Sequence, residues 1–186
     1  GLPRISGHRA GAESVRRAVD CCIRLGVKHL TLYAFSSENW SRPASEVTAL
    51  LQLLERPLKA KTTEMTKQNV RLHPIGRLDM LPAKTRAQLD KAVAATANNT
   101  ALTLNLALSY GSREEMVDAT KAIAAKVAAG EMALDEIDNH SFSNHLYTAG
   151  QPDPDLLIRT SGELRLSNFL LWPLSYAAIV ILDKFW

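Results

Sequence analysis

Short apolar segments typical of β-strands alternate along this 186-residue chain with longer segments of helical periodicity. This alternation limits the possible folds more than any other feature of the sequence. Strands separated by helices of a dozen or more residues form βαβ crossovers, which build parallel sheets. We therefore predict a single α/β domain over residues 1–186, with a mostly parallel central sheet flanked by helices.

The individual elements follow from the two periodicities. Helices are expected over residues 12–25, 45–68, 82–97, 112–129 and 134–146. Strands are expected over residues 29–35, 70–75, 101–108, 155–159, 168–172 and 177–182. Ser45 is a candidate N-cap of the second helix, and Pro57 predicts a kink within it.

Composition excludes several classes of protein. Apolar residues make up 46% of the chain and charged residues 22%, which is ordinary globular usage and excludes disordered and fibrous chains. Lys and Arg number 22 against 19 Asp and Glu, and this small excess does not indicate nucleic-acid binding. The most apolar stretch, residues 169–182, is shorter than the roughly 20 residues that span a bilayer.

The two cysteines bear on the cellular compartment. Cys21 and Cys22 are adjacent, so they cannot form an ordinary disulfide with each other, and no Cys or His spacing indicates zinc. A reducing cytoplasm is the simplest setting for such a chain.

Ligands of parallel α/β sheets bind beyond the carboxyl ends of the strands. The loop after the strand at 155–159 reads TSGELRLSN, and it gathers cationic and hydroxyl side chains with one glycine. Guanidinium groups clamp phosphate oxygens bidentately, so this loop is a candidate phosphate site. The alternative is a solvated loop whose arginines pair with surface carboxylates. A second candidate anion site is the segment with Arg4, His8 and Arg9, placed just before a helix, although a lone histidine there is more often a cap.

The loop SSENW directly follows the strand at 29–35. Ser36, Glu38 and Asn39 could position a reacting group or take part in proton removal, and Trp40 could cover an apolar ligand. Alternatively, this is a helix-entry loop with Trp40 as a core plug. The apolar stripe of the helix at 45–68 similarly fits either core packing or the lining of a hydrocarbon slot. The sequence contains neither GxxxxGK[ST] nor GxGxxG, which disfavours nucleotide hydrolases and dehydrogenases.

Three segments, TLYAFSSENWSRPASEV, LTLNLALSYGSREE and DLLIRTSGELRLSNFLLWPLSYA, resemble the cis-prenyltransferase family. GLPRISGHRAG is similar to the stretch that follows the family's catalytic aspartate motif, and the similarity covers essentially the whole chain. The resemblance implies condensation of isopentenyl pyrophosphate with an allylic pyrophosphate such as farnesyl pyrophosphate. The product would be a polyprenyl pyrophosphate lipid carrier, made with Mg²⁺ by a homodimer and delivered to the membrane, without a nucleic-acid partner.

The resemblance also assigns roles to residues of this sequence. Arg4 and His8 would hold the allylic pyrophosphate, Asn39 would assist proton removal, and the loop around it would close over the substrates. Isopentenyl pyrophosphate would lie at the second arginine-containing loop. The substrate-binding residues implied are Arg4, His8, Ser36, Ser37, Glu38, Trp40, Arg42, Arg159, Arg165, Leu166 and Ser167. The hydrophobic tunnel would be lined by Ala34, Leu50, Leu54 and Leu102, with Leu102 at the floor that sets product length.

Some positions depart from the family pattern. The segment with the Mg²⁺-binding aspartate is absent from this sequence, Ala178 stands where the family has a metal-binding glutamate, and Arg77 stands where it commonly has aspartate. We therefore expect a chain shortened at both ends, with no metal ligand of its own and weak turnover alone. The alternatives are a non-catalytic partner subunit of a heteromeric cis-prenyltransferase and a general phosphate-ester-binding α/β domain. The apolar residues 170–182 could serve a dimer interface or the core.

Overall fold

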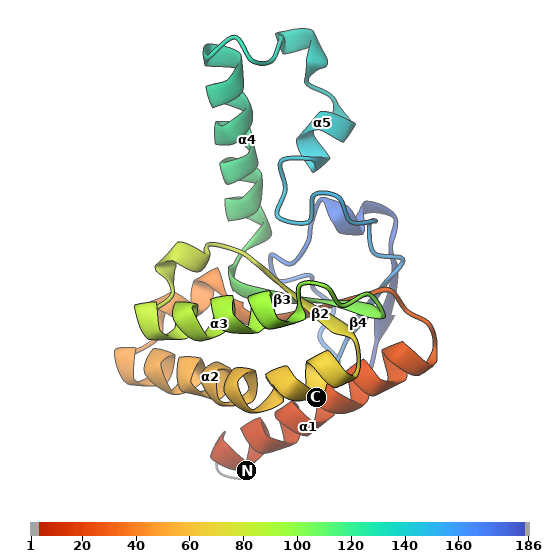
Figure 1. Cartoon of the computed structure of the whole chain (residues 1–186). Coiled ribbons are helices and arrows are strands. Elements are labelled where there is room, and N and C mark those ends of the chain that lie inside the picture. Colours follow the sequence, from red (N-terminus) through yellow and green to blue (C-terminus); the bar gives the residue numbers. More distant parts are fainter. Residues whose placement is uncertain (1–3, 185–186) are drawn as a thin grey trace.

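The computed structural model describes residues 4–184 and, within them, the side chains of residues 13–54, 58 and 61–184. Its parallel strands and flanking helices confirm the α/β class (Figure 1). The described strands form two sheets. One is three-stranded with the order β1-β3-β2, and the other pairs β4 with β5.

The element bounds agree with most of the predicted ranges. The strands are β1 (His29–Ser36), β2 (Val70–Ile75), β3 (Leu102–Tyr110), β4 (Leu156–Arg159) and β5 (Ala178–Ile181). The α-helices are α1 (Arg4–Arg24), α2 (Ala44–Lys67), α3 (Ala83–Thr96), α4 (Ser112–Ala128) and α5 (Asn139–Ser143). Short 3-10 helices are η1 (Ser37–Ser41), η2 (Leu78–Met80), η3 (Leu134–Glu136) and η4 (Pro173–Tyr176).

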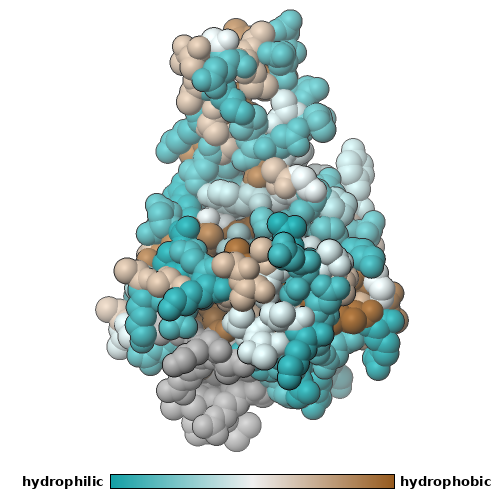
Figure 2. Space-filling view, in the orientation of Figure 1, coloured by the Kyte–Doolittle hydropathy of each residue, from teal (hydrophilic) through white to brown (hydrophobic). Residues whose placement is uncertain are grey.

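Helices α1, α2 and α3 form one layer against the three-stranded sheet, whereas α4 projects away from that layer and returns through α5 (Figure 1). The main core lies between this helical layer and the sheet, where Leu72 of β2 and Leu104 of β3 meet Leu51 of α2. The surface of the projecting α4–α5 part is mostly hydrophilic (Figure 2). No helix in residues 4–184 combines the length and the apolar character needed to cross a membrane.

A second core cluster joins the three-stranded sheet to the C-terminal part of the chain. Tyr110, at the end of β3, is fully buried there with Phe169, Leu170 and Leu174. The aromatic rings of Tyr33 and Phe169 are stacked with their centroids 4.6 Å apart. The residues after β4 therefore pack back onto the first sheet.

A polar network fixes the chain between α5 and β4 to the sheet. Asn105, in the central strand, is 3% exposed, and its amide exchanges two hydrogen bonds with the amide of Gln151, at 2.7 and 3.0 Å. Gln151 Oε1 also lies 3.1 Å from His29 Nδ1. A buried amide that is fully paired stabilises one register of the segment it contacts.

Four predictions about elements are wrong. Residues 168–172 form turns rather than a strand, because Asn168 and Leu170 adopt positive φ angles of 59° and 46°. The helix expected over 134–146 is divided into η3 and the five-residue α5, which begins after the N-cap Asp138. The N-cap of α2 is Pro43, and Ser45 lies inside the helix.

The fourth correction concerns α1, which starts at Arg4 rather than near residue 12. Arg4 and His8 therefore lie within the first turns of this helix and not in a loop before it. Their side chains are outside the described residues. The same holds for the side chain of Pro57, at which α2 continues without interruption.

Candidate active site

The carboxyl ends of the three parallel strands of the first sheet lie at one edge and lead into short turns. β1 leads into η1, β2 leads through Gly76 into η2, and β3 leads through Gly111 into α4. The register pairs Ser36 with Tyr110, so η1 and the start of α4 begin at the same level of the sheet. This is the edge at which parallel α/β sheets bind ligands.

Hydrogen bonds within η1 hold the SSENW loop. Asn39 Oδ1 accepts from the backbone N–H of Ser36 at 2.9 Å, and Ser37 Oγ donates to Glu38 Oε2 at 3.2 Å. The Asn39 side chain thus stabilises the loop in which it stands.

The Trp40 side chain contacts the end of β3. Its indole N–H donates to Ser109 Oγ at 2.9 Å, and its ring packs edge-on against Phe35 with the centroids 5.0 Å apart. Ser109 is buried with φ of 49°. Trp40 is partly buried against the main core cluster, and this contact leaves the prediction that it covers an apolar ligand untested.

The arginine-containing loop brings its two guanidinium groups together. Arg159 Nη1 donates to Ser167 Oγ at 2.8 Å and to the carbonyl of Arg165. Glu163 Oε2 lies 2.6 Å from Arg165 Nη2 and 4.0 Å from Arg159 Nη2. The arginines therefore gather around one acidic side chain, and an incoming phosphate group would compete with that carboxylate for them.

Backbone hydrogen bonds anchor the first half of this loop. The N–H groups of Ser161 and Gly162 donate to the carbonyls of Lys184 and Leu182, at 2.9 and 3.0 Å. Gly162 has the positive φ of 66° that favours glycine. Its N–H group is used inside the protein and is therefore not available to an anion in this conformation.

A cavity of about 140 Å³ lies beside the same two arginines. Its walls are mostly apolar. The lining residues are Leu157, Arg159, Leu164, Arg165, Leu166, Ile179 and Ile181. A cationic group next to a small apolar space suits a ligand that carries both phosphate and hydrocarbon.

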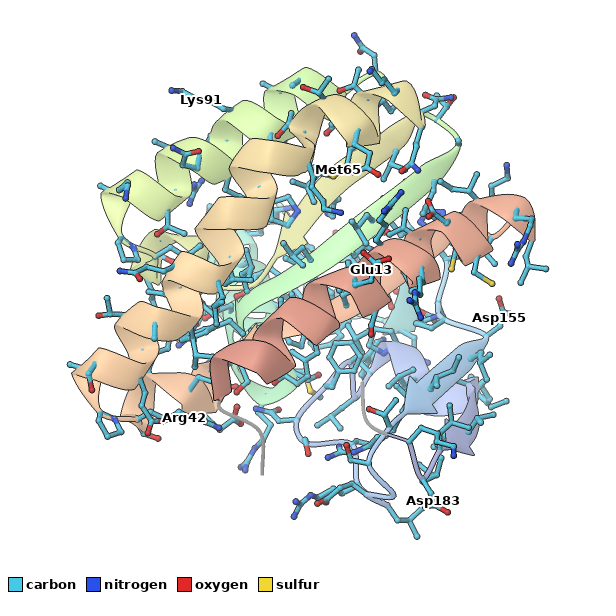
Figure 3. All side chains as sticks on the ribbon, turned by 90° about the horizontal axis from the view of Figure 1, so that it is seen from below. Glu13, Arg42, Met65, Lys91, Asp155 and Asp183 are labelled. Atoms are coloured by element: carbon cyan, nitrogen blue, oxygen red, sulfur yellow. The ribbon has the colours of Figure 1, made fainter. Side chains whose placement is uncertain are left out.

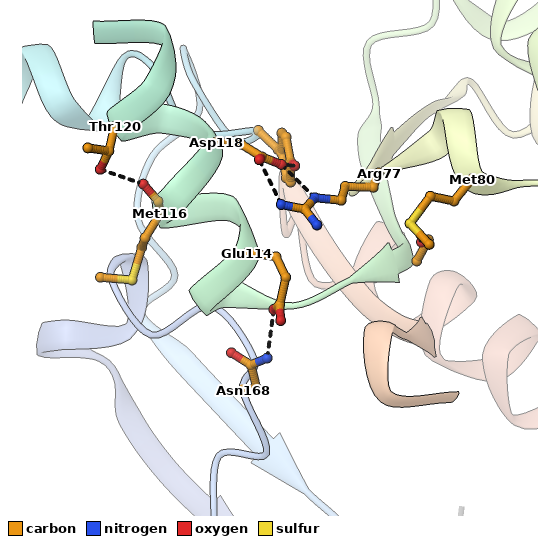
Figure 4. A network of polar contacts seen from close by, with 9 residues as sticks. Arg77, Met80, Glu114, Met116, Asp118, Thr120 and Asn168 are labelled. Carbon is orange, nitrogen blue, oxygen red and sulfur yellow. Dashed lines mark hydrogen bonds and ion pairs between the residues drawn. The ribbon is translucent and has the colours of Figure 1, made fainter. Parts of the chain in front are cut away.

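The SSENW loop and the arginine-containing loop meet at the N-terminus of α4. Asn168 Nδ2 donates to Glu38 Oε1 at 2.9 Å. It also donates to Glu114 Oε2 at 3.0 Å (Figure 4). A Cβ atom at Gly111 would lie 2.5 Å from Ser37 Oγ and 2.7 Å from Asn168 Nδ2. A larger residue at this position would therefore displace these side-chain ends from their contacts.

The carboxyl of Glu38 and the phenol of Tyr33 have shifted pKa values. Burial alone would raise the pKa of Glu38, but hydrogen bonds from Asn168 and Ser37 outweigh it and lower the pKa. Burial, and then the charge of Glu38, raise the pKa of Tyr33 well above its ordinary value. Tyr33 therefore stays a neutral donor, and its hydroxyl donates to the carbonyl of Tyr110 at 3.1 Å. Glu38 stays ionised and negative at neutral pH.

Other predicted site residues lie elsewhere or pack as core. Arg42 points to Glu46 one helical turn on, with 3.7 Å between Nη1 and Oε2, and half of its side chain is exposed. In Figure 3, Arg42 and Asp183, which follow β1 and β5, both lie toward the lower end of the view. The four predicted tunnel residues belong to one cluster between α2 and the sheet: Ala34, Leu50, Leu54 and Leu102.

Magnesium ligands are not assembled in the described part of the chain. The described side chains, those of residues 13–54, 58 and 61–184, contain no group of three or more His, Cys, Asp or Glu that could hold a metal ion. Ala178 is the first residue of β5 and carries no donor. The described side chains therefore do not form a Mg²⁺ site by themselves.

Several residues of this edge escaped the sequence reasoning. Ser109, Gly111, Glu114 and Asn168 join the two loops, yet none was a candidate. Asn168 and Ser109 act through left-handed backbone and long-range contacts, which leave no local pattern in a sequence. The one feature of the sequence that indicated their position was the apolar strands that end beside them.

Comparison with known proteins agrees with this geometry. Residues 1–186 match the family model of undecaprenyl diphosphate synthase. The chain is 52% identical to an isoprenyl transferase of Heliobacterium mobile over 186 residues, all of this chain and 72% of that protein. It is 48% identical over 185 residues to a ditrans,polycis-undecaprenyl-diphosphate synthase, (2E,6E)-farnesyl-diphosphate specific, of Micrococcus luteus, covering 100% of this chain and 74% of that one.

A solved structure has the same fold. The crystal structure of lavandulyl diphosphate synthase from Lavandula x intermedia, in complex with dimethylallyl diphosphate, superposes with a TM-score of 0.93. The two sequences are 35% identical, and the match covers 96% of this chain and 78% of that one. The chain therefore belongs to the undecaprenyl diphosphate synthase family of prenyltransferases.

Proposed function

We propose that this protein acts in cis-prenyl chain elongation, condensing isopentenyl pyrophosphate with an allylic pyrophosphate such as farnesyl pyrophosphate. The observation that carries the proposal is the meeting of two functional loops at one sheet edge. The loop with Arg159, Arg165 and Ser167 lies against the SSENW loop through Asn168. The relatives reported above support the allylic pyrophosphate as substrate.

In this proposal the arginine-containing loop binds isopentenyl pyrophosphate. Arg159 and Arg165 exchange the carboxylate of Glu163 for pyrophosphate oxygens, and Ser167 donates its hydroxyl. The apolar cavity beside them, with Leu166 in its wall, takes the hydrocarbon part. Arg4 and His8 of α1 would hold the allylic pyrophosphate.

The reaction breaks the bond between allylic C1 and oxygen, and pyrophosphate leaves with the electron pair. The double bond of isopentenyl pyrophosphate attacks C1, a carbon–carbon bond forms, and a proton leaves the adjacent carbon. Ser36, Ser37, Glu38, Asn39 and Trp40 would enclose this step, with Asn39 assisting proton removal and Arg42 at the end of the loop. Positive side chains stabilise the developing negative charge on pyrophosphate.

The growing chain would occupy the space between α2 and the sheet. Ala34, Leu50 and Leu54 already pack in one cluster with Leu102, which is 1% exposed. We expect Leu102→Ala to shift the products toward longer chains, because it opens the floor of the tunnel. Thin-layer chromatography of the dephosphorylated products measures this shift, and an unchanged length distribution would contradict the tunnel assignment.

We expect turnover by residues 1–186 alone to be weak, since Ala178 provides no carboxylate and the described side chains assemble no metal cluster. We propose Mg²⁺, a homodimer, and delivery of the polyprenyl product to the membrane as further properties of the active enzyme. In β5, Ile179 and Val180 are 52% and 41% exposed, so this strand has apolar surface available for a partner subunit.

Calorimetry with isopentenyl pyrophosphate, farnesyl pyrophosphate and ATP tests the proposal. Both prenyl pyrophosphates should bind in preference to ATP. Arg159→Ala should weaken the binding of isopentenyl pyrophosphate about 30-fold or more, because charge-assisted hydrogen bonds are lost. Arg86→Ala is the matched control, since Arg86 pairs with Asp90 on the exposed face of α3. Preference for ATP would overturn the assignment.

A second candidate function is a non-catalytic subunit of a heteromeric cis-prenyltransferase. Ala178 at the position of the family's metal-binding glutamate is the observation that favours it. Co-expression with a complete synthase, a pull-down and a radiolabelled isopentenyl pyrophosphate assay distinguish the two. Lack of association would exclude the subunit role, and increased incorporation by the pair would support it.

A further inference from the structure

Asn168 uses all of its side-chain polar groups to join separate parts of the chain. Its Nδ2 donates to Glu38 of η1 and to Glu114 of α4, at 2.9 and 3.0 Å. Its Oδ1 accepts from the backbone N–H of Arg113 at 2.8 Å, and its carbonyl accepts from Ser112 at 2.8 Å. One side chain thus contacts the SSENW loop and caps α4, while its own backbone continues the arginine-containing loop.

The backbone at this point is itself unusual. Ser167 and Asn168 adopt consecutive positive φ angles of 52° and 59°. Asparagine is among the few residues besides glycine that tolerate this left-handed conformation. The same turn places Ser167 Oγ 2.8 Å from Arg159 Nη1. The geometry that sets the anion-binding side chains is therefore continuous with the contact to η1.

From these contacts we infer that Asn168 is a positioning residue, which holds the SSENW loop and the arginine-containing loop in one fixed arrangement through Glu38. This rests on the function proposed above. Movement of η1 would break the bond to Glu38, and movement of the residues around 167 would break the cap on α4. The positions of the two loops are therefore coupled through Asn168.

The amide is required, and not merely a residue of this size. A carboxylate in its place could still accept from the N–H of Arg113, but it would face the carboxylates of Glu38 and Glu114 without a proton to donate. Like charges at hydrogen-bond distance repel. Asn168→Asp therefore removes the two hydrogen bonds that Asn168 donates while keeping the shape of the side chain. Asn168→Gly keeps the left-handed backbone but removes all side-chain contacts.

The test combines these variants with a swap of donor and acceptor. Asn168→Asp should weaken isopentenyl pyrophosphate binding about tenfold by calorimetry, as expected for the loss of one charge-assisted hydrogen bond. Adding Glu38→Gln restores a donor opposite the new carboxylate and should recover most of the affinity. Adding Glu114→Gln instead should recover much less. Equal recovery with Glu114→Gln, or none with Glu38→Gln, would reduce Asn168 to a cap of α4 and overturn the inference.

A second measurement does not depend on ligand binding. Amide hydrogen exchange in residues 37–41 should accelerate in Asn168→Asp and Asn168→Gly, and it should slow again in the Asn168→Asp, Glu38→Gln pair. Unchanged exchange in η1 would overturn the inference even if the protein binds isopentenyl pyrophosphate. If the wild-type chain binds no prenyl pyrophosphate but η1 responds, the proposed function fails and the positioning role stands.

Discussion

Gly76 is a residue at which backbone and space both require glycine. Its φ is 122°, and a Cβ atom would lie 2.0 Å from the carbonyl oxygen of Leu108. Backbone atoms of a central strand cannot move aside. We expect Gly76→Ala to lower the free energy of unfolding by about 3 kcal/mol or more, because strain and overpacking add.

Gly130 gives the matched control for this prediction. Its φ is 71°, but nothing lies within 4 Å of a Cβ atom built there. Gly130→Ala should cost about 1 kcal/mol from backbone strain alone. Urea unfolding of both variants measures the difference, and equal costs would contradict the close approach of Gly76 to β3.

At this scale the sequence predicts chemistry better than placement. Arg159 and Ser167 were correctly expected to lie near each other, since both stand in one short loop after a strand. Arg42 was expected at the substrates, and its half-exposed ion pair with Glu46 leaves this prediction untested. Asn168 was missed because its partners, Glu38 and Glu114, are 130 and 54 residues away.

Helix α4 is tied to the turn after β2 by one ion pair. Arg77 donates two hydrogen bonds to Asp118, at 2.8 and 2.7 Å (Figure 4). The Tyr147 hydroxyl donates a third at 2.6 Å. These bonds, with Arg77 foremost, lower the pKa of Asp118 below its ordinary value. Asp118 therefore stabilises the fold at pH values above the pKa of an unfolded aspartate, and this contribution disappears as the pH falls through the folded value.

We expect Asp118→Asn to lower the free energy of unfolding by about 1 to 2 kcal/mol at pH 7. The difference from wild type should shrink as the pH falls below about 4, because both chains then lack the charge. Urea titrations at pH 7 and pH 3 check this. Asp90→Asn, which breaks the exposed pair with Arg86 on α3, should cost no more than about 0.5 kcal/mol at either pH. A pH-independent cost for Asp118→Asn would contradict the assignment.

Whole elements were predicted well where periodicity was long. The ranges for α2, α3 and α4 differ from the prediction by at most one residue at each end. The strand predicted over residues 168–172 was wrong because a short apolar run looks the same in a strand and in a buried turn. The prediction of one helix over residues 134–146 was wrong because Asp138 caps a new helix inside that range. Its side chain accepts from the N–H of Ser141 at 2.7 Å.

On the scale of the whole molecule, the two sheets should differ in local stability. β3 is paired on both sides. Its last four residues are buried, since Ala107, Leu108, Ser109 and Tyr110 are each at most 1% exposed. Strands β4 and β5 pair only with each other in the described chain, and Ile158 and Ile179 are 56% and 52% exposed.

We expect the amides of β3 to exchange hydrogen at least roughly tenfold more slowly than those of β4 and β5. Hydrogen–deuterium exchange resolved by residue measures this. Equal protection would indicate that a partner subunit or another segment covers the second sheet in solution. The sequence predicted the strands of both sheets, but it could not show that they form two sheets, because pairing between distant strands depends on packing around Phe169 and Tyr110.

The strand order β1-β3-β2 has a consequence for synthesis on the ribosome. Within residues 4–184, both outer strands of this sheet pair only with β3, which is made after them and lies at residues 102–110. Until that segment leaves the exit tunnel, the two earlier strands have no neighbour within the sheet, and their apolar residues remain available to other chains. Late pairing of distant strands slows folding and prolongs this exposure. Nascent chains that stop just before residue 102 should therefore depend on chaperones, and those that extend well beyond residue 110 should not.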